Sequence, residues 1–310
     1  MDEFKHYTVM KNEAVDALNC TNGLVYVDCT LGGGGHSELI LNRIQPDGRL
    51  IAFDIDEDAI SASKERLKDY KNLTIVKDSY TNIKKVLQNL GIEKITGGVL
   101  FDLGASYHQL TKAERGFSFS KEAHLDMRFD KSSTLSAYDV VNTYSEADLV
   151  RIFSEYGEEH FSKRIAKKII EVRRVKKLET TTELADLIVS ATPRVKSSVH
   201  PATRVFQAIR IEVNQELTNV KNTLNDVLDL LDVGAIISVI SFHSLEDRIV
   251  KQIFKYHSQR CHCDKTQMIC KCPPPRLELI NKKPITATEG EIRENPPSRS
   301  AKLRIARCIN

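Results

Sequence analysis

The chain has 310 residues, of which 45 are Lys or Arg and 42 are Asp or Glu, so its formal net charge is +3. A hydrophobic fraction of 41% with 28% charged residues is typical of globular proteins and argues against a disordered or fibrous chain. The longest apolar run, residues 233–242, is far shorter than the ~20 residues that cross a bilayer. Charged residues also occupy the start, where a signal peptide needs an apolar core. We therefore expect a soluble cytoplasmic protein without a membrane partner.

The first hundred residues alternate between strand patterns and helical patterns. Strands are expected over residues 24–27, 50–53, 73–76 and 98–101. Strand–helix–strand units at this spacing build a parallel sheet. Each strand ends at or just before an acidic residue, namely Asp28, Asp54, Asp78 and Asp102. Because ligands of such sheets bind beyond the carboxyl ends of the strands, these acids are the first indication of function.

Four glycines at positions 32–35 follow the first expected strand and precede a helix. Glycine there allows a tight turn and a close approach of a ligand to the main chain. A phosphate-binding loop would need Lys followed by Ser or Thr, and His36 and Ser37 stand there instead; the glycines also fail to complete the dinucleotide pattern. Asp54 lies twenty residues beyond Gly34, where a carboxylate can bind ribose hydroxyls. The pattern favours a nucleoside cofactor. S-adenosylmethionine, which has no phosphate, is one such ligand; an NAD-dependent oxidoreductase is the alternative, and the incomplete dinucleotide pattern argues against it.

Strand patterns disappear between residues 106 and 213, and helical patterns replace them. A helix expected over 159–177 has an apolar side and eight basic residues between Lys163 and Lys177, which suit a polyanionic partner or simply a solvated surface. Another long helical pattern covers 203–231, and strands resume at 233–242 and 301–307. We therefore expect one discontinuous α/β domain, residues 1–105 and 214–310, with an all-helical domain inserted at residues 106–213.

Seven sequence blocks stand out along the chain: VDCTLGGGGHS, FDLGAS, ERGFSF, LDMR, HPATRVFQAIRIEVNQEL, SFHSLEDR and RSAKLRIA. Together, and in this order, they resemble the MraW/RsmH family of bacterial small-subunit ribosomal RNA methyltransferases. The resemblance implies a class I (Rossmann-like) methyltransferase sheet with an inserted helical domain. It also implies transfer of a methyl group from S-adenosylmethionine to N4 of a cytidine in the decoding centre of 16S rRNA, at conventional position 1402. The implied partner is the small ribosomal subunit.

The resemblance assigns cofactor-binding roles to residues that match the family's motifs. These are Gly34, Gly35 and His36 for the methionine part, Asp54 for the ribose, Tyr80 beside the adenine, and Asp102 with Gln109 for the remaining contacts. Tyr107 and His108 depart from the family pattern, although Asp102 and Gln109 remain in register on either side of them.

The exocyclic amino group of cytosine is a poor nucleophile, because its lone pair is delocalised into the ring. Orientation of the reactants can supply ~7–11 kcal/mol, and an acceptor for the amino proton helps further. Asp102 and His243 are the candidate catalytic groups. Cofactor binding is the favoured role for Asp102, and a structural role is the alternative for His243. Tyr107 is a candidate for stacking on the base.

Basic residues of the helical region are the candidates for RNA binding. They are Lys167 and Lys168, with Arg204 and Arg210, whose alternative is a salt bridge to Glu212 or Glu216. A non-catalytic RNA-binding protein that retains the fold is the alternative function. The oligomeric state stays open, with a homodimer as one option.

Four of the seven cysteines, Cys261, Cys263, Cys270 and Cys272, form a C-x-C-x6-C-x-C pattern. An odd cysteine count without a signal peptide argues against a secreted disulfide framework. Four thiolates in a short loop can hold a structural Zn²⁺, although two to four residues usually separate paired ligands. We expect a reduced surface loop, with structural zinc as the less favoured alternative.

Overall fold

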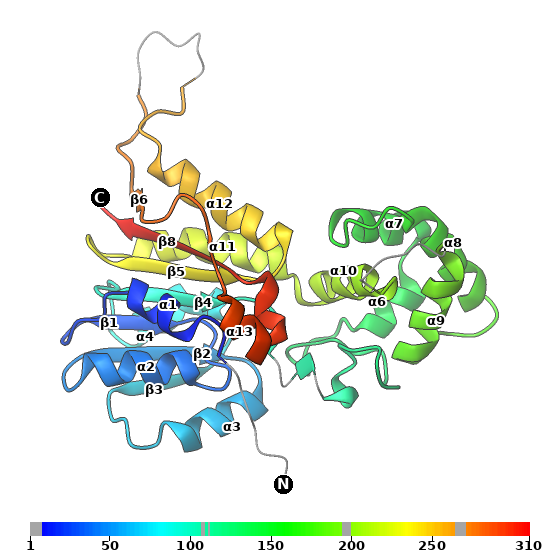
Figure 1. Cartoon of the computed structure of the whole chain (residues 1–310), viewed down its shortest axis with the longest axis horizontal. Helices are drawn as coiled ribbons and strands as arrows, with labels where there is room; N and C mark the ends of the chain where they lie inside the picture. The colour runs from blue at the N-terminus through cyan, green and yellow to red at the C-terminus, as the bar shows by residue number, and fades with distance from the viewer. Residues whose placement is uncertain (1–7, 107–108, 111, 194–199, 264–270) are drawn as a thin grey trace. The chain divides into compact units, whose positions relative to one another are not determined.

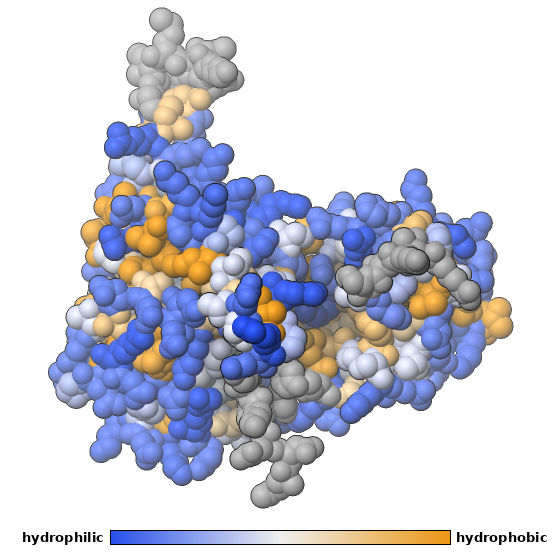
Figure 2. Space-filling view, viewed as in Figure 1, coloured by the Kyte–Doolittle hydropathy of each residue, from blue (hydrophilic) through white to orange (hydrophobic). Residues whose placement is uncertain are grey.

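Two units make up the chain in the computed structural model (Figure 1). The first consists of residues 1–104 and 217–310, and the second of residues 105–216. The structure describes residues 8–106, 109–110, 112–193, 200–263 and 271–310. Among these, no helix has both the length and the apolar character needed to span a bilayer. Hydrophilic residues dominate the face shown in Figure 2, with smaller apolar patches between them.

The described strands of the first unit form one eight-stranded sheet in the order β3-β2-β1-β4-β5-β8-β6, with β7 paired to β8. Strands β1 to β5 run parallel, and β8 is antiparallel to β5. The strand order reverses between β1 and β4, and ligands of α/β sheets bind at such a switch point. The expected Rossmann-like sheet is therefore confirmed. The strand bounds are β1 Val25–Asp28, β2 Arg49–Asp54, β3 Leu73–Lys77, β4 Gly98–Asp102, β5 Ile236–Ser241, β6 Leu277–Leu279, β7 Ile285–Thr286 and β8 Lys302–Cys308.

Separate apolar cores cover the two faces of this sheet. Alternate residues of a strand point to opposite faces, so Phe101 packs in one core with α4, α11 and α12, whereas Leu100 packs in the other with α1 and α2 (Figure 1). Burial on both faces explains the nearly continuous apolar sequence of the central strands. The helix bounds are α1 Lys11–Ala17, α2 Gly35–Ile44, α3 Glu57–Arg66, α4 Ile83–Asn89, α11 Glu216–Leu230, α12 Ser244–Ser258 and α13 Glu289–Glu294.

Within its described residues, the second unit contains helices and no named strand. Ser136 and Thr180 form capping boxes at the starts of α6 and α9. Helix α8 buries Ile165, Ala166 and Ile169 and exposes most of its basic residues, as its periodicity predicts. The helix bounds are α6 Ala137–Thr143, α7 Glu146–Glu155, α8 Ser162–Arg173, α9 Thr181–Ala191 and α10 Ala202–Asn214, with the 3-10 turn η2 at Ala113–Arg115.

The prediction of one long helix over residues 203–231 is wrong, because the helix is interrupted after α10. Gln215 has φ +49°, a left-handed conformation that ends the helix, and α11 begins at the next residue. The side-chain amide of Asn214 donates to Met127 O at 2.8 Å, so a contact distant in sequence accompanies the break. The break coincides with the end of the second unit.

Candidate cofactor and active site

Asp54 ends β2, and its carboxylate fixes the glycine loop. Gly32 N donates to Asp54 Oδ2 at 2.8 Å, and Asp56 N donates to Asp54 Oδ1 at 2.9 Å. Burial raises the pKa of Asp54 to about 6, against the lowering effect of these backbone hydrogen bonds. A carboxylate can accept about four hydrogen bonds in total, so Asp54 retains capacity for hydroxyl donors such as those of a ribose.

The glycine loop passes close to the chain that precedes α1. Gly34, the residue before α2, has φ +76°, a conformation that side chains other than glycine seldom adopt. At Gly35 a Cβ would stand 1.8 Å from Thr8 Oγ1. Both positions therefore require glycine, one for its backbone conformation and the other for space.

Asp28, at the end of β1, is fully buried beside the glycine loop. Ser37 Oγ donates to Asp28 Oδ2 at 2.7 Å, and Thr30 N donates to Asp28 Oδ1 at 3.0 Å. Burial raises the pKa of Asp28, while these hydrogen bonds lower it. Thr30 Oγ1 also accepts from Asp102 N at 2.7 Å, so the carboxyl ends of β1 and β4 are joined through Thr30.

Asp102 ends β4 and lies beside His36, with 3.8 Å between His36 Nδ1 and Asp102 Oδ2. His36 Nε2 lies 3.0 Å from Val9 O. A carbonyl oxygen only accepts, so Nε2 carries a hydrogen, and Nδ1 is the ring nitrogen that faces Asp102. Burial, reinforced by the charge of Asp28, raises the pKa of Asp102 well above its usual value.

One oxygen of this carboxyl group, Asp102 Oδ1, is buried and has no hydrogen-bond partner among the described residues. Buried polar atoms are nearly always hydrogen-bonded, because leaving one unsatisfied costs free energy. Asp102 Oδ1 is therefore the atom of this site that most clearly calls for a ligand donor.

Tyr80 follows β3 at the start of the short turn η1, Tyr80–Asn82. Its ring packs edge-on against Phe101, with 5.8 Å between centroids and 83° between planes, and remains partly exposed. Gln109 belongs to the second unit, where its buried Oε1 accepts from Ser106 N at 3.0 Å. Tyr107 and His108 lie outside the described residues.

Five of the seven expected cofactor residues thus lie at the carboxyl ends of β1, β2 and β4 in one unit. These are Gly34, Gly35, His36, Asp54 and Asp102. Thr30 and Ser37, which hold Asp28, were not among the expected site residues. For Thr30 the available signal was the D-x-T spacing after the strand, which is typical of an aspartate carboxylate that accepts a hydrogen bond from the backbone N–H two residues later.

His243 lies between β5 and α12, at another strand end of the first unit. Its Nε2 is 3.1 Å from Glu246 Oε1, and Glu246 Oε2 accepts from Phe242 N at 2.9 Å. Glu246 is almost fully buried. Glu246 is thus a nearby acidic neighbour of His243, yet both ring nitrogens of His243 are buried without a hydrogen-bond partner among the described residues, so His243 and Asp102 both remain candidate catalytic groups.

The candidate RNA-binding residues differ in what they contact. Lys167, Lys168 and Arg204 are exposed on α8 and α10. Lys168 Nζ lies 3.7 Å from Glu171 Oε2, and Arg204 donates to Glu158 O at 3.3 Å. Arg210 instead donates two hydrogen bonds to the buried carboxylate of Glu216, at 2.8 and 2.9 Å. The salt bridge that the sequence left open for Arg210 is therefore present.

One member of the basic run in α8 has a structural contact. The guanidinium of Arg173 donates to Val141 O at 2.7 Å and to Tyr144 O at 2.5 Å, near the end of α6. These bonds satisfy carbonyl groups that a helix end leaves without partners. Arg173 is therefore less available to a polyanion than its exposed neighbours.

The family model described as the MraW methylase family matches residues 3–309. Relatives named "Ribosomal RNA small subunit methyltransferase H" include the protein of Caldicellulosiruptor bescii, 53% identical over 99% of this chain and 100% of that protein. The Clostridium botulinum (strain Loch Maree) protein is 48% identical over 99% of this chain, and that of Geobacter sp. (strain M21) is 49% identical over 100%; both relatives are matched over 100% of their length. A solved structure of an rRNA methylase from Streptococcus thermophilus matches 96% of this chain and 95% of its own chain, at 10% identity and a TM-score of 0.43.

Proposed function

This chain belongs to the MraW methylase family, and on that premise we propose that it transfers a methyl group from S-adenosylmethionine to ribosomal RNA of the small subunit. More narrowly, we propose N4 of a cytidine in the decoding centre of 16S rRNA, at conventional position 1402, as the acceptor. The observation that supports the cofactor most directly is the cluster of Asp54, His36 and Asp102, with its unsatisfied Asp102 Oδ1. A non-catalytic RNA-binding protein would have no need of this cluster.

The residues of the first unit fit S-adenosylmethionine in chemistry. The carboxylate of Asp54 would accept from the ribose hydroxyls, and the exposed part of the Tyr80 ring would contact the adenine. The main chain at Gly34 and Gly35 would lie against the methionine part, because no side chain intervenes there. When bound, this cofactor supplies an electrophilic methyl group on a sulfonium centre.

Asp102 has two roles open to it in the proposed reaction. Its unsatisfied oxygen can accept from an amino group, either that of the cofactor or that of the target base. A raised pKa makes a carboxylate a stronger base, and a cation bound nearby favours its ionised form. We propose that Asp102 binds the cofactor and also stands as the acceptor candidate for the amino proton.

We propose that residues 105–216 recognise the RNA. Exposed lysines and arginines contact phosphates without reading sequence, and Lys167, Lys168 and Arg204 have the required exposure. The lysines lie on the helix that carries most of the basic run. A ribosomal substrate places the proposed activity in the cytoplasm.

Calorimetric titration with S-adenosylmethionine tests the cofactor assignment. The wild type is expected to bind one equivalent. Asp54→Ala should weaken binding at least about tenfold, since hydrogen bonds to a charged group are worth ~1.5–3 kcal/mol. Asp69→Ala, a change at an exposed aspartate outside the cluster, is the matched control and should bind like the wild type. Absence of binding to a folded wild type would contradict the proposal.

A further inference from the structure

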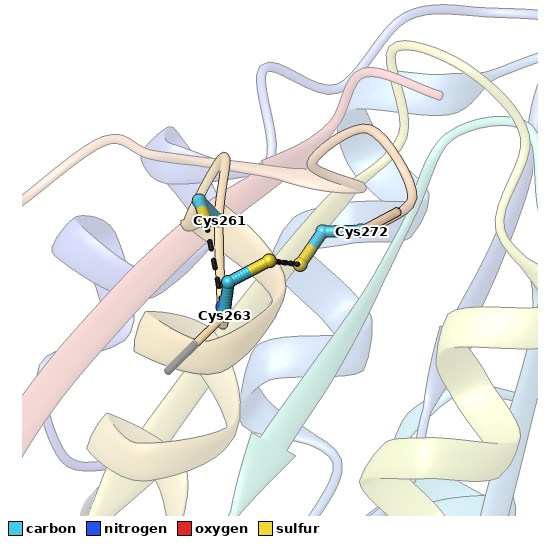
Figure 3. A group of neighbouring side chains, drawn as sticks. All are labelled: Cys261, Cys263 and Cys272. Carbon is cyan, nitrogen blue, oxygen red and sulfur yellow. Dashed lines mark hydrogen bonds between the residues drawn. The ribbon is translucent and has the colours of Figure 1, made fainter. Parts of the chain in front are cut away.

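A cysteine cluster lies in the segment that connects α12 to β6 (Figure 3). Protein contacts fix both ends of the segment. The ring of His262 stacks on Tyr256 of α12, with 4.1 Å between centroids and 19° between planes. At the other end, Arg276 N donates to His257 O at 2.8 Å, and the Arg276 guanidinium lies 3.1 Å from Asp229 Oδ1. These contacts therefore hold both ends of the cysteine-containing segment in place.

Three sulfur atoms of this segment lie close enough to share one ion. The Sγ atoms of Cys261, Cys263 and Cys272 are all within 4.8 Å of one another. In Figure 3 the sulfurs of Cys263 and Cys272 point toward each other, and 3.5 Å separates them. Sulfurs at ~2.3 Å from a tetrahedral Zn²⁺ would be about 3.8 Å apart, whereas a disulfide needs about 2.05 Å. The observed 3.5 Å is the length of a thiol hydrogen bond, and it lies far closer to the edge of a zinc tetrahedron than to a disulfide bond.

Backbone N–H groups also point at two of these sulfurs. His262 N donates to Cys272 Sγ at 3.1 Å, and Cys263 N donates to Cys261 Sγ at 3.4 Å. Hydrogen bonds of this kind stabilise thiolates and orient them as metal ligands. The second bond also shows how a C-x-C pair turns to bring both sulfurs to one side, although its spacing is shorter than usual for zinc ligands.

We propose that Cys261, Cys263 and Cys272 bind a Zn²⁺ ion through their thiolates. Soft thiolate ligands favour zinc over magnesium or calcium. Binding releases the thiol protons to solvent and leaves three Zn–S bonds, with a fourth position for water or another side chain. Cys270 lies outside the described residues, and the proposal does not depend on it. The ion would link the stretch that carries Cys261 and Cys263 to the stretch that carries Cys272. This proposal is independent of the proposed methyl transfer.

Metal analysis of the purified full-length chain tests this inference. Protein prepared without chelators should retain about one equivalent of zinc. Replacement of the zinc by Co²⁺ should give the intense visible absorption of tetrahedral cobalt with a sulfur-to-metal charge-transfer band. Neither readout depends on methyl transfer, so failure here and failure of the proposed function are distinguishable.

A variant pair locates the site. Cys263→Ser should weaken Zn²⁺ affinity at least about tenfold, the lower range for loss of a metal-site interaction. Cys20→Ser, at a cysteine outside the cluster, should leave the affinity unchanged. Reduced wild type that neither retains zinc nor develops the Co²⁺ spectrum overturns the proposal. So does zinc binding that survives in Cys263→Ser, or a disulfide between Cys263 and Cys272 in protein handled without oxidants.

Discussion

The pKa of Asp54 gives S-adenosylmethionine binding a defined dependence on pH. Ribose hydroxyls donate to the ionised carboxylate, and burial raises the pKa of this group to about 6. About nine-tenths of the carboxyl groups are then ionised at pH 7 and about one-tenth at pH 5. The Asp54 contribution alone should therefore weaken binding about tenfold, or ~1.4 kcal/mol, between pH 7 and pH 5.

Asp54→Asn is the reference for this measurement, because an amide keeps the shape and does not titrate. Asp102 titrates in the same site with a raised pKa, so the informative quantity is the ratio of the two Kd values at each pH. Calorimetry from pH 5 to pH 8 should show this ratio changing about tenfold with a midpoint near pH 6. A ratio that stays constant while both proteins remain folded would refute the role of Asp54.

The sign is opposite for the stability of the protein without cofactor. Folding raises the pKa of Asp54 from its ordinary value of 3.8 to about 6, so the folded state holds this proton more tightly than the unfolded chain. The stability that the proton contributes is complete below about pH 4 and is lost as the pH rises through about 6. Bound cofactor should offset that loss, because it uses the ionised form.

Three further variants test other parts of the account. Lys167→Glu with Lys168→Glu should weaken binding to small-subunit rRNA about tenfold or more and reduce its salt dependence, measured by filter binding, since each phosphate contact releases counterions. Gly35→Ala should lower the melting temperature and the S-adenosylmethionine affinity, because the new methyl group would stand 1.8 Å from Thr8 Oγ1; adding Thr8→Gly should restore much of both. Arg210→Ala should destabilise the second unit by on the order of 3 kcal/mol in urea unfolding, because the buried carboxylate of Glu216 loses the guanidinium that donates two hydrogen bonds to it.

Each of these changes has a result that would contradict it, and the lysine reversal also has a matched control. Lys282→Glu with Lys283→Glu reverses two exposed adjacent lysines of the first unit and should leave RNA binding unchanged. Parallel loss of cofactor affinity in the α8 variant would show instead that the reversal damages the fold. A Gly35→Ala protein as stable as the wild type would contradict the steric argument. An unchanged urea midpoint for Arg210→Ala would show that the pair is not needed for stability.

Local patterns predicted the sheet of the first unit well. The strands β1, β2, β4 and β5 are nearly continuous apolar runs that end at acids or turns, and both of their faces are buried, so the sequence pattern follows directly from the burial; β3, at the edge of the sheet, is only partly buried. The same patterns placed Asp54 and Asp102 at the carboxyl ends of strands. The short strands β6 and β7, which each pair with β8, escaped prediction, because strands of two or three residues carry little pattern.

Features that depend on contacts between residues far apart in the sequence could not be predicted from local sequence patterns. The apolar spacing continues across Gln215, and only contacts such as that between Asn214 and Met127 accompany the break there. The link from Thr30 to Asp102 joins residues 72 apart, so no local spacing reveals it. Whether Arg210 pairs with Glu212 or with Glu216 likewise depends on the folded structure and could not be predicted from the sequence.

Methyl transfer to small-subunit rRNA is the central claim, and one labelling experiment tests it most directly. Small ribosomal subunits from cells that lack this methylation are incubated with the purified chain and methyl-labelled S-adenosylmethionine, and the 16S rRNA is digested and mapped by mass spectrometry. The account predicts one labelled nucleoside, N4-methylcytidine, in a single decoding-centre fragment, with Asp54→Ala much slower at limiting cofactor. Label on another nucleoside, or no label from a chain that binds the cofactor, would contradict it.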